Sequence, residues 1–142
     1  MPVIKFKLLN KDAKLPVYLH EDDAAFDIYA VESVLIKKKK YKSVSTGVAS
    51  EIPKGYFVSI RDRSGLAFKN GIHLLGGVID AGYRGEWFVA VANLGDEDYK
   101  IEKGDRIAQG ILHKIPKAKI KEVKNLSDTD RGEKGIGSTG KK

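Results

Sequence analysis

Short alternations of apolar and polar residues recur along the chain, and they predict β-strands rather than helices. The alternation, or a short β-branched run, occurs at residues 3–9, 26–31, 56–61, 87–94, 106–111 and 119–123. Side chains two positions apart lie on the same face of a strand, so each segment offers one face to a core. Glycine, proline and aspartate separate the segments, as is usual in sandwiches and jelly rolls. We therefore predict an all-β, jelly-roll-like sandwich or barrel.

Helical periodicity is weak throughout the chain. The best candidate is residues 64–69, where Ser64 would act as the N-cap and Gly65 in the first turn limits the helix to one or two turns. The last stretch lacks apolar periodicity and is rich in Gly, Asp, Ser, Thr and Lys, which is typical of a flexible tail. We expect a β domain over residues 1–125 and a C-terminal flap over residues 126–142.

Composition narrows the functional classes. A chain of 142 residues with 42% hydrophobic residues is expected to form one domain. It has no cysteine, which excludes disulfides and thiolate metal sites, and no apolar run of membrane-spanning length. We expect a cytoplasmic protein. The net charge of +7 favours a polyanionic partner, but the run Lys37 to Lys40 lacks interleaved arginine and indicates a solvated turn, not a nucleic-acid surface.

A glycine-rich turn at residues 76–86 is the strongest candidate for chemistry. It holds the carboxylate of Asp80 and the ring of Tyr83 between two apolar segments. Glycines let the backbone approach a ligand closely, and Asp80 is then a candidate general base. The alternative is a hairpin in which Asp80 serves only the turn geometry.

The flap contains a second glycine-rich stretch. Residues 135–140 satisfy the pattern G-x-G-x-x-G, but the strand and helix that this motif requires are missing around it, so we do not interpret it as a dinucleotide site. Flexible amides, the hydroxyls of Ser138 and Thr139, and the guanidinium of Arg131 nevertheless suit phosphate binding.

Five segments follow one another in a specific order, at residues 24–30, 61–67, 77–85, 104–109 and 131–140. Together they closely resemble the five motifs of the trimeric deoxyuridine triphosphatases (dUTPases). The resemblance implies hydrolysis of dUTP to dUMP and pyrophosphate by water attack at the α-phosphorus, with Mg²⁺ as cofactor. It also implies a homotrimer in which the flap closes on a neighbouring subunit's site, and a cellular role in keeping uracil out of DNA and supplying dUMP for thymidylate synthesis.

The same resemblance assigns roles to single residues. Asp80 matches the base that activates water, Tyr83 the aromatic that packs on deoxyribose, and Asp27 the acid that supports the water shell of Mg²⁺. The residues matched to triphosphate contacts are Arg63, Ser64, Gly65, Gln109, Arg131, Ser138 and Thr139. Gly77 and Ile79 match the backbone that reads uracil, and Ile136 and Gly137 match the part of the flap over the base. For Asp27 and Tyr83 the alternative is a structural role at a strand end.

Two positions depart from the family pattern. Asp62 stands where the family usually has proline, at the edge of its motif, and we expect little effect. Ile136 replaces the usual aromatic that stacks on uracil. His20, His73 and His113 show neither metal-ligand nor acid-base spacing, so we expect them in surface or strand positions.

Other functions remain as alternatives. A dCTP deaminase or a bifunctional dCTP deaminase/dUTPase shares the dUTPase fold but adds a catalytic glutamate and usually a longer chain. A non-catalytic nucleotide-binding regulator, or a basic β domain that binds nucleic acid, would not need Asp80, Gln109 and Arg131 together. The sequence therefore favours a dUTPase without stable nucleic-acid or membrane association.

Overall fold

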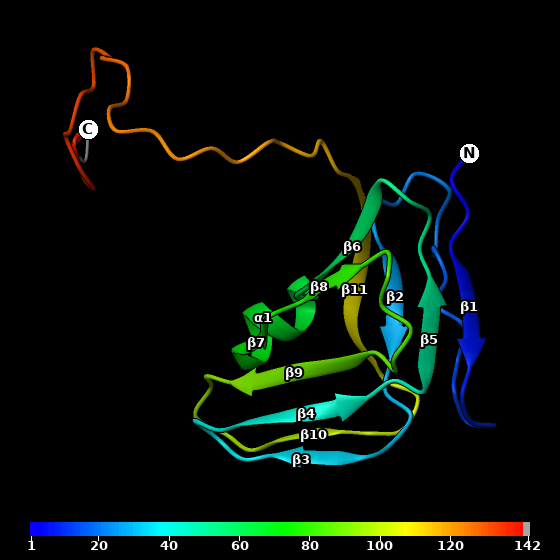
Figure 1. The fold of residues 1–142 in the computed structure, drawn as a ribbon. Coiled ribbons are helices and arrows are strands. Elements are labelled where there is room, and N and C mark those ends of the chain that lie inside the picture. The colour runs from blue at the N-terminus through cyan, green and yellow to red at the C-terminus, as the bar shows by residue number, and fades with distance from the viewer. Residues whose placement is uncertain (141–142) are drawn as a thin grey trace.

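The computed structural model describes residues 1–140 and is built mainly from antiparallel β-strands (Figure 1). The strands form four sheets with the orders β1-β5, β10-β3, β2-β11-β6-β8 and β4-β9-β7. The strand bounds are β1 Lys5–Leu8, β2 Phe26–Tyr29, β3 Val34–Ile36, β4 Tyr41–Ser45, β5 Val48–Glu51, β6 Tyr56–Arg61, β7 Ile72–Leu75, β8 Val78–Asp80, β9 Phe88–Asn93, β10 Tyr99–Ile101 and β11 Arg106–Lys114. The predicted all-β class is confirmed.

Strand β11 is the longest strand and lies in the middle of the four-stranded sheet. It pairs with β2 on one side and with β6 on the other, and β8 extends the sheet beyond β6. Gly110 sits in the middle of β11 because the ring of Phe26 covers it, and a Cβ atom there would overlap the ring. The close contact lets β2 and β11 pack tightly next to the core.

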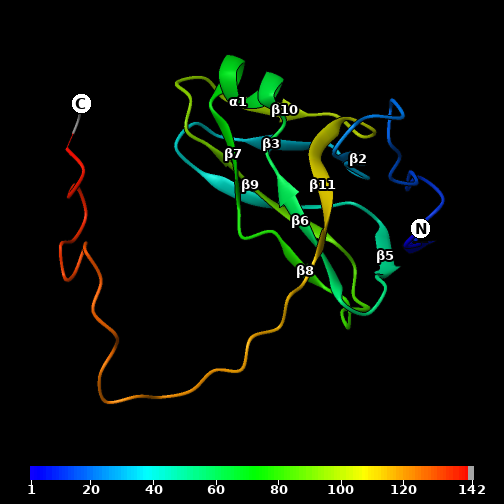
Figure 2. The ribbon, with the colours of Figure 1, turned by 90° about the horizontal axis from the view of Figure 1, so that it is seen from above.

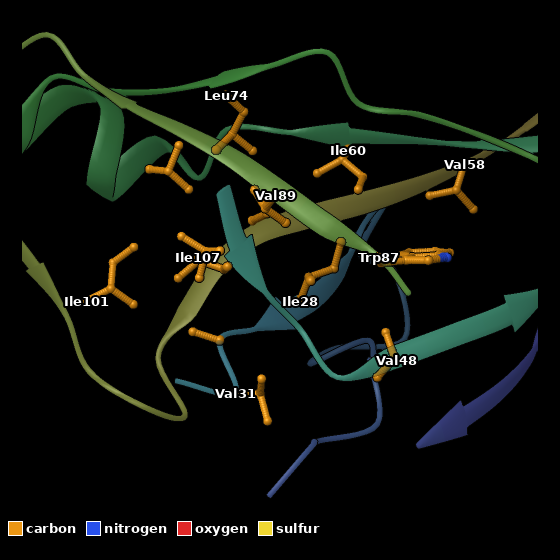
Figure 3. Close-up of a cluster of buried hydrophobic side chains, with 14 of the residues drawn as sticks. Ile28, Val31, Val48, Val58, Ile60, Leu74, Trp87, Val89, Ile101 and Ile107 are labelled. Carbon is orange, nitrogen blue, oxygen red and sulfur yellow. The ribbon is translucent and has the colours of Figure 1, made fainter. Parts of the chain in front are cut away.

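The inner faces of the sheets enclose one hydrophobic core. Figure 3 shows part of it, with Ile28, Val58 and Val89 gathered around Trp87. Trp87 is fully buried, and its Nε1 donates to Ser50 Oγ at 3.1 Å, so its one polar atom is satisfied inside the core.

The one helix within residues 1–140 is α1, Ser64–Asn70. Arg63, not Ser64, occupies the N-cap position, and its side chain makes no capping hydrogen bond, so the predicted Ser64 cap is wrong. Gly71 ends the helix in the left-handed region with φ 66°, where glycine has no steric penalty. No helix within residues 1–140 is both long and apolar enough to cross a membrane.

The segment after β11 forms no strand up to residue 140, so the strand predicted at residues 119–123 is wrong for this chain. Figures 1 and 2 show the segment running away from the body of the molecule. Ile120 is 96% exposed and Leu126 is 87% exposed. The alternating pattern is present, but residues 119–123 run away from the sheets, so no strand lies beside them to pair with. Lys37 to Lys40, by contrast, form the expected exposed turn, between β3 and β4.

Replacing Trp87 by alanine should strongly destabilise the fold. The substitution removes the largest fully buried side chain and leaves a cavity, at an expected cost of about 3–5 kcal/mol in the free energy of unfolding. Urea denaturation at one fixed protein concentration measures the change. The exposed Phe68→Ala on α1 is the control and should have little effect. Equal stability of the two variants would contradict this assignment of the core.

Candidate active site

The outer face of the four-stranded sheet carries a row of polar side chains. Asp27 of β2 lies opposite Gln109 of β11, and Gln109 lies opposite Arg61 of β6. Residues directly opposite on antiparallel strands place their side chains on the same face. Their neighbours Phe26 and Ile60 point the other way and are buried in the core. The strand register therefore brings three polar side chains together from distant parts of the chain.

Asp27 holds two guanidinium groups at one end of this row. Its Oδ1 accepts from Arg63 Nε at 3.1 Å, and its Oδ2 accepts from Arg106 Nη1 at 3.3 Å. The side chain of Asp27 is only 13% exposed, so water screens these pairs less than it screens surface pairs. Two cations facing one carboxylate leave an excess of positive charge.

A cavity of about 410 Å³ opens beside Asp27 and its two arginines. Its lining residues are Leu19, His20, Asp23, Ala24, Ala25, Asp27, Arg63, Ser64, Gly65, Arg106, Gln109 and Ile111. Guanidinium, hydroxyl and amide groups outnumber the acids in this lining, which suits a ligand with several phosphate oxygens. The structure thus brings together the predicted residues of the first, second and fourth segments.

The third segment lies elsewhere in the same chain. Asp80 ends β8 and lies opposite Phe57 of β6. Phe57 and Arg61 are four residues apart on β6, so Asp80 lies about 13 Å along the strand from Arg61. Asp80 is exposed and does not line the cavity beside Asp27. Gly77, with φ 104°, accepts at its carbonyl from the Ile60 amide at 2.7 Å, and a Cβ atom there would lie 2.7 Å from the Ile60 carbonyl oxygen. Only glycine fits this close approach to β6.

Tyr83 has a fixed orientation on the turn after β8. Its hydroxyl donates to the Glu86 carbonyl at 2.8 Å, and a Cβ atom on Gly85 would lie 2.5 Å from that hydroxyl. The Glu86 carboxylate accepts in turn from the Gly47 amide at 2.9 Å and from the Ser45 hydroxyl. The ring is 43% exposed yet anchored through the turn to the neighbouring strands.

The predicted flap residues are exposed and lie away from the cavity. The hydrogen bonds of Arg131 are local, from Nε to the Lys134 carbonyl and from Nη2 to the Gly135 carbonyl, both at 3.2 Å. Ile136 is fully exposed, and Gly137, Ser138 and Thr139 follow it in an exposed turn. A single chain therefore does not bring the flap to the cavity beside its own Asp27.

Sequence reasoning missed three residues of this region. Arg106 was visible within the fourth segment but had no assigned role, although it pairs with Asp27. His73 lies exposed in β7, as expected, but its contact with Asp62 was not foreseen: His73 Nδ1 lies 2.7 Å from Asp62 Oδ2. Residues 62 and 73 meet only because β6 and β7 approach each other in the fold. The other strand histidine, His113, stacks on Phe57 with ring centroids 4.9 Å apart, as expected for a strand position.

The fold and the cavity define an all-β protein with a polar cavity that two arginines line. A family model described as dUTPase matches residues 11–140. Proteins named deoxyuridine 5'-triphosphate nucleotidohydrolase are similar over nearly the whole chain. The one from Clostridium tetani is 46% identical over 140 residues and covers 97% of each chain. The one from Nautilia profundicola is 48% identical over 140 residues and covers 97% of this chain and 99% of its own.

Solved structures agree with these relatives. The dUTPase of Staphylococcus bacteriophage 80alpha with dUpNHpp matches with a TM-score of 0.90 and 32% identity, over 97% of this chain and 98% of that chain. A dUTPase mutant of phage phi11, described with a structural Mg(II) ion, matches with a TM-score of 0.82 and 26% identity, over 89% and 99%. The chain belongs to the dUTPase family and is an enzyme of the dUTP diphosphatase class. The predicted jelly-roll fold is confirmed by these structural matches.

Proposed function

We propose that this enzyme hydrolyses dUTP to dUMP and pyrophosphate through a water molecule activated by Asp80. The observation that carries the proposal is the convergence of Arg63, Arg106, Ser64 and Gln109 on one cavity beside Asp27. Such a cavity provides the guanidinium, hydroxyl and amide donors that a triphosphate needs.

The chemical step begins with a base that activates water next to a well-positioned phosphate. The Asp80 carboxylate takes a proton from water as the water oxygen bonds to the α-phosphorus. The bond from that phosphorus to the bridging oxygen breaks, and pyrophosphate leaves. The arginines and Gln109 stabilise the negative charge on the phosphate oxygens, and no covalent enzyme intermediate forms.

Mg²⁺ fits this site as an ion carried by the nucleotide. Within residues 1–140, no three histidine, aspartate or glutamate side chains cluster as a ready metal site. Asp27 already accepts from two arginines, so it suits contact with the ion through water. Mg²⁺ usually keeps several waters and binds substrate phosphates, where it offsets their charge.

We propose that three chains share each site. Asp80 and the flap both lie outside the cavity of their own chain, and the exposed apolar side chains of Ile120 and Leu126 have no partner in that chain's body. A homotrimer would supply Asp80 from one neighbour and the flap from another. In this arrangement residues 1–125 form the β domain, and residues 126–142 act as a lid over a neighbour's site.

The base and sugar would bind beside Asp80. The backbone at Gly77 and Ile79 would read uracil, and the anchored ring of Tyr83 would occupy the space that a 2′-hydroxyl requires. Arg131, Ser138 and Thr139 of the flap would hold the terminal phosphate, with Gly137 and Ile136 over the base. We further propose that the enzyme acts in the cytoplasm, where it keeps uracil out of DNA and supplies dUMP for thymidylate synthesis.

Asp80→Asn should abolish most turnover of dUTP. Loss of the base is expected to lower kcat at least about 100-fold while leaving dUTP binding largely intact. The measurement is pyrophosphate release in Mg²⁺ buffer from dUTP, UTP, dTTP and dCTP, with Asp96→Asn as a control at an exposed acid paired with Lys39. Hydrolysis of dUTP alone by the wild type is expected. Ammonia release from dCTP, or binding of dUTP without hydrolysis, would contradict the proposal.

Ile136→Phe should lower the KM for dUTP. Base–aromatic stacking contributes about 1–3 kcal/mol, so a ring at this position should strengthen flap closure and lower KM about fivefold or more. Ile136→Leu, which changes the side chain without adding a ring, is the matched control and should keep the wild-type KM. An unchanged KM in Ile136→Phe would show that residue 136 does not lie over the base.

A further inference from the structure

Asp62 connects three segments of the proposed site. Its Oδ1 accepts from the Leu74 amide at 2.9 Å, and its Oδ2 lies 2.7 Å from His73 Nδ1. Its backbone carbonyl accepts from Gln109 Nε2 at 2.7 Å. Asp62 thus ties the end of β6 to β7 in the other sheet and to the central strand β11.

These bonds lie at one end of a second cavity. Here the chain crosses from β7, which pairs with β9, to β8, which pairs with β6 (Figure 2). The crossing leaves a space of about 440 Å³. Its lining residues are Ile60, Arg61, Asp62, His73, Leu74, Gly76, Gln109 and Ile111. Gly76 lies next to Gly77, whose backbone we propose to read uracil, and Ile60 is the hydrogen-bond partner of Gly77.

Two hydrogen bonds restrain the width of this space. The Ile60 amide donates to the Gly77 carbonyl at 2.7 Å at the β8 end. The Leu74 amide donates to the Asp62 carboxylate at the β7 end. The first bond is part of the backbone pairing, whereas the second depends on one side chain.

We propose that Asp62, supported by His73, is a positioning residue that sets the width of the uracil cavity and so the preference for uracil over thymine. The inference rests on the proposed dUTPase function, because it takes the 440 Å³ cavity as the site of the base. A cavity excludes a methyl group only if its walls cannot separate. Without the Asp62 carboxylate, the Leu74 amide loses its acceptor and β7 is free to move away from β6.

The His73 ring has a supporting role in this arrangement. Its Nδ1 is hydrogen-bonded to Asp62 Oδ2, whereas the Leu74 amide donates to Asp62 Oδ1. The His73 side chain is 53% exposed. The pairing orients the carboxylate so that Oδ1 faces the Leu74 amide. Removing the ring should therefore weaken the restraint less than removing the carboxylate.

The test measures kcat and KM for dUTP and dTTP in Asp62→Ala, Asp62→Asn and His73→Ala. Asp62→Ala should raise the KM for dUTP about fivefold, change kcat less than about twofold, and lower the preference for dUTP over dTTP about tenfold. Asp62→Asn keeps an acceptor for Leu74 and should restore both values to within about twofold of the wild type. His73→Ala should fall between the two.

The controls separate this inference from the proposed function. Asp96→Ala also removes an exposed acid, one that pairs with Lys39 and does not line the cavity. This variant should behave as the wild type. If Asp62→Ala does not fold, Asp62→Ser replaces it. Serine has a single side-chain oxygen and cannot bind both His73 and the Leu74 amide. A wild type that fails to hydrolyse dUTP would overturn the function. A wild type that is active, with Asp62→Ala or Asp62→Ser keeping the same KM and preference, would overturn only the role of Asp62.

Discussion

The double pairing of β11 is the constraint on which the rest of the structure depends. One strand holds β2 on one edge and β6 on the other, and its alternation sends Ala108 and Gly110 toward the core and Gln109 toward the site. A shift of one residue in this register would reverse the two faces, burying the polar row and exposing the apolar one. The register of β11 that packs the core is therefore also the register that places the polar side chains of the site.

A single chain provides a cavity with two arginines, but Asp80 and the flap lie away from that cavity. Asp27 orients two arginines without cancelling their charge, and this partly buried group makes a cavity suited to a triphosphate. The base proposed for the reaction, Asp80, lies about 13 Å along the sheet from Arg61. The flap lies away from the body. The distance of the cavity from Asp80 and from the flap is the physical reason for the proposed assembly, in which a neighbouring chain would supply each of these parts.

Much of the fold was predictable, and the failures have identifiable causes. Strands with clear alternation, such as β2, β6 and β9, were predicted close to their observed bounds. Short strands such as β8, with three residues, carry too little periodicity to be recognised. Residues 119–123 have the pattern of a strand but run away from the sheets, so no strand lies beside them. The contact of Asp62 with His73 could not be predicted, because it depends on how closely two strands of different sheets approach.

The central claim is that each site combines Asp80 from one chain with the flap from another. The most direct test co-expresses two separately tagged chains, one with Asp80→Asn and one ending at Arg131, and assays the purified mixed assemblies. Each parent should be nearly inactive by itself. Random assembly should place an intact Asp80 and an intact flap together in about one site in four, so the mixture should regain about a quarter of wild-type activity. Mixed assemblies as inactive as both parents would show instead that each chain builds its own site.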